Sequence, residues 1–154
     1  KGSGKLILTG SLGDVIKESV NVALSYIKSN YKKFNINYDK LVNSDIHIHM
    51  PDNSIKKDGP SAGSAITLSI ISAFSNKKIK NNIALTGEIT LHGHILKIGG
   101  LKEKSLGALR SGVEKIFIPK DNMSDISTLP NNVLEKIEFI PVDNFMDIYN
   151  KLEV

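Results

Sequence analysis

The sequence contains no cysteine and no long hydrophobic run, and each absence excludes a class of structure. Without cysteine the chain forms neither disulfide bonds nor thiolate metal sites, which is compatible with a reducing compartment. The longest apolar stretch, residues 65–74, is interrupted by Ser and Thr and falls far short of the ~20 residues that cross a bilayer. The first residues carry no hydrophobic segment before a cleavage site, so we expect neither a signal peptide nor a membrane partner.

Aromatic residues are also scarce, with five Phe, four Tyr and no Trp in 154 residues. The formal net charge of +4 could indicate a nucleic-acid partner. The lysines are scattered, however, and no basic stripe with interleaved aromatic residues occurs. We therefore do not expect nucleic-acid binding to be the main function of this domain.

Hydrophobic periodicity predicts one α/β domain over residues 1–154, in which helices pack on a mixed sheet. Helices are expected where apolar residues recur every three or four positions, and strands where short β-branched runs end at Gly or Pro. The expected helices span residues 14–31, 61–74 and 101–112, with a short one after residue 121 and a last one from residue 143. The expected strands span residues 5–9, 45–50, 83–85, 89–91, 95–98, 115–118 and 137–140.

Ser61 stands at the start of the second expected helix, directly after Gly59 and Pro60. The first turn of a helix offers unpaired N–H groups and the positive end of the helix dipole, which can stabilise an oxyanion. Pro60 suits an early helical position, and Gly59 and Gly63 would let a substrate backbone approach closely. These residues alone leave an alternative open, in which Asp58 caps the helix and Ser61 is a small packing residue.

The histidines form two pairs with one residue between them, His47 with His49 and His92 with His94. On a strand, residues i and i+2 share a face, so each pair could hold a metal ion. Neither pair has an acidic residue or a cysteine at ligand spacing, and solvated or packed histidines are the simpler interpretation. We therefore expect no metal in this domain.

A nucleophilic serine needs a base, and two lysines are the remaining candidates. Lys102 and Lys104 lie at the start of the third expected helix, among leucine and alanine residues. Burial of a lysine in apolar surroundings lowers its pKa and frees the amine lone pair to accept a proton. A helical wheel places Lys102 within the apolar arc and Lys104 at its edge, so the helical pattern leaves the choice between them open.

The segments that contain Ser61 and the two candidate lysines belong to a longer series of motifs along the chain. The series comprises Leu8-Thr9-Gly10-Ser11-Leu12-Gly13-Asp14-Val15 with Glu18-Ser19, Asp45-Ile46-His47-Ile48-His49, Lys57-Asp58-Gly59-Pro60-Ser61-Ala62-Gly63, Thr86-Gly87-Glu88-Ile89-Thr90-Leu91, Gly99-Gly100-Leu101-Lys102-Glu103-Lys104 and Ile118-Pro119-Lys120-Asp121-Asn122. In this order the motifs resemble the proteolytic domain of Lon proteases of the bacterial and mitochondrial type, from about residue 4 to the C-terminus. The implied fold is the Lon proteolytic-domain fold, which is similar to a domain found in ribosomal proteins.

The resemblance implies a serine endopeptidase in which Ser61 is the nucleophile and Lys104, rather than Lys102, is the general base. The backbone N–H groups of Ser61 and Ala62 would bind the oxyanion. Thr86 would hydrogen-bond and orient the lysine, although a strand-end threonine without that role is the alternative. The resemblance adds three supporting residues beside the site, without a metal: Asp58, His47 and His49.

The resemblance further implies that residues 1–154 lack an upstream hairpin of the family domain, together with the ATPase and substrate-binding domains. ATP and magnesium are expected on that ATPase domain, with no cofactor on this one. The whole protein is expected to form a hexameric ring that degrades unfolded or damaged proteins in the mitochondrial matrix or the bacterial cytoplasm. One departure from the family is Lys56, which replaces a usual proline and removes a rigid φ angle before the nucleophile. The alternatives are an inactive Lon-like module that serves only in assembly and a nucleic-acid-binding module.

Overall fold

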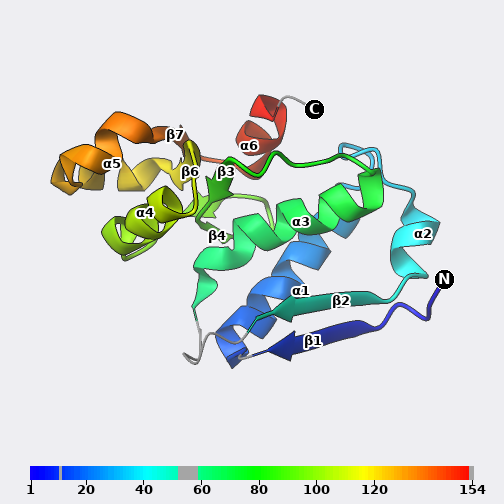
Figure 1. The fold of residues 1–154 in the computed structure, drawn as a ribbon. Helices are drawn as coiled ribbons and strands as arrows, with labels where there is room; N and C mark the ends of the chain where they lie inside the picture. The colour runs from blue at the N-terminus through cyan, green and yellow to red at the C-terminus, as the bar shows by residue number, and fades with distance from the viewer. Residues whose placement is uncertain (11, 52–58, 153–154) are drawn as a thin grey trace.

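The computed structural model describes residues 1–10, 12–51 and 59–152, and its strands form three small sheets (Figure 1). In the first sheet, β1 (Leu6–Gly10) pairs in parallel with β2 (Ile46–Met50). The second sheet is parallel with the order β3 (Ile83–Leu85), β6 (Lys115–Pro119) and β7 (Glu138–Val142). The third pairs β4 (Glu88–Ile89) antiparallel with β5 (Ile95–Leu96). The expected α/β class is confirmed, and its strands are divided among these sheets rather than joined in one.

The three long helices predicted from hydrophobic periodicity are present: α1 (Asp14–Ser29), α3 (Gly63–Ser75) and α4 (Leu101–Arg110). The helix expected from residue 61 is an α-helix only from Gly63, because a 3-10 turn, η1 (Pro60–Ala62), precedes it. The helix expected after residue 121 divides into a 3-10 segment, η2 (Lys120–Thr128), and α5 (Asn131–Lys136). The last helix is α6 (Phe145–Lys151), and a short helix that was not predicted is α2 (Tyr38–Val42).

Two hydrophobic clusters lie on opposite faces of the β3-β6-β7 sheet, because neighbouring side chains of a strand point to opposite faces. On β6, Phe117 belongs to the larger cluster with α1, α3 and α6. Ile116 and Ile118 belong to the smaller cluster, which α4 and α5 cover. Figure 1 shows α4 and α5 (yellow-green and orange) on one side of this sheet and α3 with α6 on the other. The sheet therefore separates α3, which directly follows the turn that contains Ser61, from α4, which carries Lys104.

No helix among the described residues is both long and apolar enough to span a bilayer.

Candidate active site

Ser61 lies in the η1 turn, and one backbone hydrogen bond from this turn and a second from the start of α3 tie this region to the loop after β3. The N–H of Gly87 donates to the carbonyl of Ser61 at 2.9 Å, and the N–H of Ser64 donates to the carbonyl of Gly87 at 3.1 Å. Pro60 occupies the first position of the turn, where its missing N–H costs nothing. The position of Ser61 is thus fixed relative to the end of β3 as well as to α3.

Gly63 is the residue at which α3 packs closely against β4. A Cβ atom at this position would lie 3.0 Å from Cγ2 and 3.1 Å from the backbone nitrogen of Ile89. Glycine at position 63 therefore allows β4 to pack closely against α3. The sequence pattern had suggested that it would make room for the substrate backbone. Gly59 differs, because a Cβ atom there would meet nothing within 4 Å.

Lys104 lies in the first turn of α4, and its Nζ is 2.7 Å from the Oγ of Ser61. The side chain is partly buried, and this burial lowers the pKa of its amine from the ordinary lysine value. The hydrogen bond joins residues that are 43 positions apart in sequence. A serine hydroxyl and an amine with a lowered pKa therefore meet at hydrogen-bonding distance.

Lys102 is exposed, so its expected position in the apolar arc of α4 is wrong. The arc runs instead through Leu101 and Ser105, which are 5% and 0% exposed. Ser105 tolerates burial because its hydroxyl donates to the carbonyl of Leu101 at 2.6 Å. A wheel that counts serine as polar misses this buried position and so misplaces Lys102, whereas Lys104 is partly buried, as its expected place at the edge of the arc requires.

Ser61 and Lys104 face a cavity of about 430 Å³ at the edge of the β3-β6-β7 sheet. Its walls are mostly small and apolar: Ala62, Ala65, Ala84, Leu85, Leu101, Gly107, Ala108, Val113 and Ile116, with Ser61, Thr86, Lys104 and Ser111 as the polar members. Among these lining residues Lys104 is the one that carries an ionisable amine or carboxyl group. Desolvation by burial accounts for the lowered pKa of Lys104.

Thr86 lines the same cavity and is 7% exposed. Its backbone N–H donates to the carbonyl of Phe117 at 3.1 Å, which ties the end of β3 to β6. Within residues 1–10, 12–51 and 59–152, no hydrogen bond joins the Thr86 hydroxyl to Lys104. The orienting role of Thr86 stays a prediction, and Asp58 lies outside the residues that the structure describes.

His47 and His49 point to the exposed face of the β1-β2 sheet, where both contact Thr9. The Thr9 hydroxyl lies 2.8 Å from Nε2 of His47 and 2.8 Å from Nδ1 of His49. Neither ring bonds to Ser61 or Lys104 among the described residues, so the supporting role of these histidines also stays a prediction. Thr9 was not singled out beforehand, because the pairing of β1 with β2 that brings it between the rings is not visible in sequence.

A second cavity of about 390 Å³ lies between β2 and α3, and both histidines belong to its lining. It shares Ala62 and Ala65 with the cavity at Ser61, so the two hollows meet beside Ser61. The remaining lining is largely apolar and includes Ile48, Met50 and Phe74. An extended chain that passes Ser61 would therefore find an apolar hollow on either side of it.

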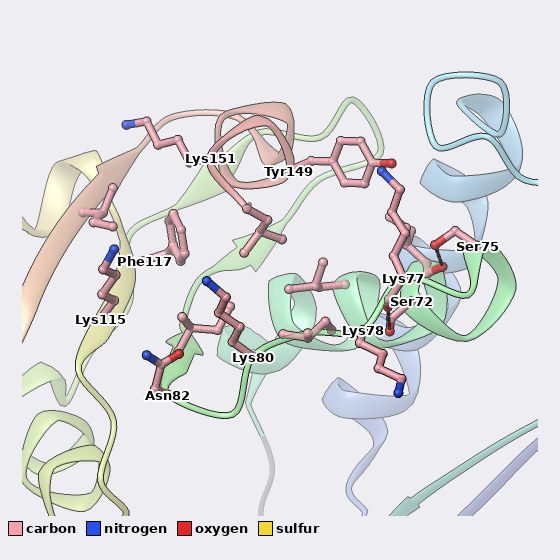
Figure 2. A pocket seen from close by; sticks show the side chains of 16 residues that line it. Ser72, Ser75, Lys77, Lys78, Lys80, Asn82, Lys115, Phe117, Tyr149 and Lys151 are labelled. Carbon is pink, nitrogen blue, oxygen red and sulfur yellow. Dashed lines mark hydrogen bonds between the residues drawn. The ribbon is translucent and has the colours of Figure 1, made fainter. Parts of the chain in front are cut away.

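A third cavity, of about 110 Å³, lies elsewhere and has a different character (Figure 2). Its lining includes Phe117 and five lysines: Lys77, Lys78, Lys80, Lys115 and Lys151. It shares no lining residue with the cavity at Ser61. No group of three or more His, Cys, Asp or Glu side chains that could hold a metal ion occurs in the described part of the chain.

Comparison with known proteins shows the family to which the chain is similar. Residues 1–153 match the family described as Lon protease (S16) C-terminal proteolytic domain. The chain is 49% identical over its whole length to the Lon protease of Aster yellows witches'-broom phytoplasma, of which it covers 20%. It is 52% identical over 97% of its length to the Lon protease of Mesomycoplasma hyopneumoniae, covering 17% of that protein. For the Lon protease of Clostridioides difficile the identity is 47% over 96% of the chain, which covers 19% of the relative.

The chain therefore spans about a fifth of the length of these relatives. The family match covers almost all of it, and each of the three relatives is more than 30% identical. The chain belongs to the Lon protease (S16) C-terminal proteolytic domain family, a family of serine endopeptidases.

Proposed function

We propose that this domain hydrolyses peptide bonds through an acyl-enzyme, with Ser61 as the nucleophile and Lys104 as the general base. The observation that carries the proposal is the 2.7 Å contact between Lys104 Nζ and Ser61 Oγ, made by an amine whose pKa is lowered by burial. A lysine of ordinary pKa stays protonated near neutral pH and cannot accept the serine proton. Burial lowers this pKa and so increases the population of the neutral amine. The contact places that amine within hydrogen-bonding distance of the Ser61 hydroxyl.

In the first half of the proposed reaction, neutral Lys104 takes the proton of Ser61 as the oxygen attacks the substrate carbonyl carbon. The carbonyl oxygen becomes an oxyanion, which the N–H groups of Ser61 and Ala62 stabilise at the start of the helix. The protonated lysine then gives its proton to the leaving amine as the C–N bond breaks. An ester between Ser61 and the acyl part of the substrate remains.

In the second half, a water molecule attacks this ester while Lys104 accepts one of its protons. The ester bond breaks, the serine oxygen regains a proton from Lys104, and the carboxylic acid product leaves. Among the described residues that line the cavity, Lys104 is the only charged one, so none of them is a counter-ion that would hold it protonated between the two halves.

We also propose polypeptide substrates in extended form, because the two cavities that meet at Ala62 and Ala65 leave apolar hollows on both sides of Ser61. Main-chain recognition in such hollows would accept many sequences. The larger protein suggested by the relatives would supply an ATPase domain that holds ATP and magnesium, a substrate-binding domain and a hexameric ring. The relatives named above are bacterial, which favours the bacterial cytoplasm over the mitochondrial matrix.

An inactive assembly module would have no need for the Ser61–Lys104 contact, so the geometry favours an enzyme. Covalent trapping of the serine tests this directly. We expect a peptidyl fluorophosphonate to add its mass to Ser61, as located by mass spectrometry, and to label Ser61→Ala at no site. Lys104→Met should slow this labelling by at least about a hundredfold, because general-base assistance contributes about 10²–10⁴ in rate. Labelling of Ser61→Ala at the wild-type rate would contradict the proposal.

A further inference from the structure

We propose that Asn122 is a positioning residue that fixes the start of α4 and thereby holds the Lys104 amine on Ser61. The inference rests on the proposed function, and it assigns a role in that function to a residue that touches neither member of the pair. It concerns η2, a segment on the Lys104 side of the molecule.

The Asn122 side chain is completely buried and makes three hydrogen bonds. Its Oδ1 accepts from the N–H of Ile98 at 3.0 Å, and its Nδ2 donates to the carbonyl of Ile98 at 2.8 Å. The same Nδ2 donates to Oδ2 of Asp125 at 2.8 Å. Because one side of the amide faces an N–H and the other faces two acceptors, only one orientation of the amide satisfies all three contacts.

Ile98 lies just before the helix that carries the proposed base. Only Gly99 and Gly100 separate it from Leu101, the first residue of α4. Both are glycines, so neither has a side chain that could pack and anchor this connection. The N–H of Lys104 donates to the carbonyl of Gly100 at 3.1 Å, which places Lys104 one helical turn beyond the connection. A displacement of Ile98 is thus carried into the turn that holds Lys104.

Asn122 is itself held on the part of the structure that also fixes the serine side of the site. It lies three residues after Pro119, the last residue of the central strand β6. In the same strand, the carbonyl of Phe117 accepts a hydrogen bond from the N–H of Thr86. The next residue, Gly87, donates its N–H to the carbonyl of Ser61. Both partners of the 2.7 Å contact are therefore positioned with reference to the end of β6.

The first test is Asn122→Asp in the full-length protein, compared with Thr128→Val. The aspartate keeps the volume and the acceptor for the Ile98 N–H, but it loses both N–H donors and places a negative charge between the Ile98 carbonyl and Asp125. The control removes a different hydrogen bond of η2, from the Thr128 hydroxyl to the Asp125 carbonyl at 2.6 Å, and leaves Ile98 untouched. The measurements are kcat and KM for a fluorogenic peptide, their pH dependence, and the thermal unfolding midpoint.

For Asn122→Asp we expect kcat to fall at least about tenfold with KM within about twofold of wild type. We also expect the rise of kcat with pH to move to higher pH, because a displaced Lys104 regains water and a more ordinary pKa. Thr128→Val should leave the kinetic constants and the pH profile of the wild type. A purely structural role for Asn122 would lower the unfolding temperature without moving the pH profile of the folded enzyme.

A second variant keeps the test decisive if Asn122→Asp does not fold. One glycine inserted between Gly99 and Gly100 leaves the hydrogen bonds of Asn122 in place and uncouples them from α4. We expect the same fall in kcat and the same displacement of the pH profile, at an unfolding temperature close to wild type. Wild-type kinetics in either folded variant would overturn the inference.

Two further variants separate failure of this inference from failure of the proposed function. If Ser61→Ala and Lys104→Ala are inactive while Asn122→Asp cleaves like wild type, only the role of Asn122 is wrong. If Ser61→Ala retains cleavage, the proposed function itself has failed.

Discussion

At the scale of single residues, the proposed chemistry depends on the protonation of Lys104. Burial lowers the pKa of this amine from the ordinary value of 10.5, so its neutral form gains population at every pH below that value. The base is the deprotonated form, and activity should therefore rise with pH through the pKa of Lys104, with a midpoint below 10.5. A pH profile of kcat/KM for an unstructured peptide reports this pKa in the free enzyme.

Lys104→Arg is the matched variant for this profile, because an arginine stays protonated at all accessible pH values. We expect it to retain the positive charge and to lose activity across the whole range. A wild-type profile that does not change with pH would contradict the assignment of a titrating base.

The place of Ser61 in the fold was predictable from sequence, whereas the residues alone left its role, as nucleophile or as packing residue, open. Ser61 follows a Gly-Pro pair at the start of a buried helix, a pattern visible in the chain. The choice between Lys102 and Lys104 was not settled by periodicity, since the burial of Ser105 rotates the packed face of α4. The role inferred for Asn122 was not predictable, because it depends on the contact between Asn122 and Ile98, which lie 24 positions apart in sequence.

At the scale of elements, two helical glycines near the site should respond oppositely to alanine. Gly63→Ala places a methyl group against Ile89 of β4, with its backbone nitrogen only 3.1 Å away, so α3 or β4 must shift. Gly107→Ala on α4 meets nothing closer than Arg110 Nη2 at 3.9 Å. We expect Gly63→Ala to lower the free energy of unfolding by about 1–3 kcal/mol and to reduce cleavage, because η1 moves with α3.

Gly107→Ala should instead raise the free energy of unfolding by about 1 kcal/mol, from helix propensity and the lower entropy of the unfolded chain. Urea denaturation of both variants gives the two values on one scale. If both substitutions changed the free energy of unfolding by similar small amounts, the close approach of α3 to β4 would not restrict the position of Ser61.

Elements with strong periodicity were predictable, and those defined by few buried residues were not. The helix α1 buries residues three or four apart along its whole length, and it was predicted to within two residues of its end. In α2 only Leu41 is buried, so no repeat exists to detect. The strand expected over residues 89–91 is wrong beyond Ile89, because the chain turns at Leu91 and leaves that side chain 58% exposed.

At the scale of the whole molecule, the site depends on the sheet that divides the two hydrophobic clusters. Ser61 is held by the larger cluster through α3, and Lys104 by the smaller one through α4. They meet around β3, the edge strand, whose Ala84, Leu85 and adjoining Thr86 form one wall of the cavity. This arrangement was not predictable from sequence, because the pairing order β3-β6-β7 and the separation into three sheets rest on contacts between distant segments.

The larger cluster contains an aromatic group whose loss should reduce stability without changing the chemistry. Phe145 is fully buried and packs edge to face on Tyr26 and Phe34, with ring centroids 5.8 Å apart in both pairs. We expect Phe145→Ala to lower the free energy of unfolding by about 3–5 kcal/mol, and Leu91→Ala, at an exposed position, to change it by less than about 0.5 kcal/mol.

Denaturant titration measures both free energies, and the pH profile of cleavage is recorded where Phe145→Ala is still folded. An unchanged profile is expected, because none of these rings lines the cavity at Ser61. A displaced midpoint would show that the pKa of Lys104 is set by the larger cluster as well.

The most direct test of the central claim is cleavage of an unstructured fluorogenic peptide by the full-length protein, comparing wild type with Ser61→Ala, Lys104→Ala and Lys102→Ala. The 2.7 Å contact predicts that the first two variants lose turnover with their fold intact and that the exposed Lys102 is dispensable. Loss of activity in Lys102→Ala with activity retained in Lys104→Ala would contradict the assignment of the base. Activity in all three variants would contradict the peptidase mechanism at this site.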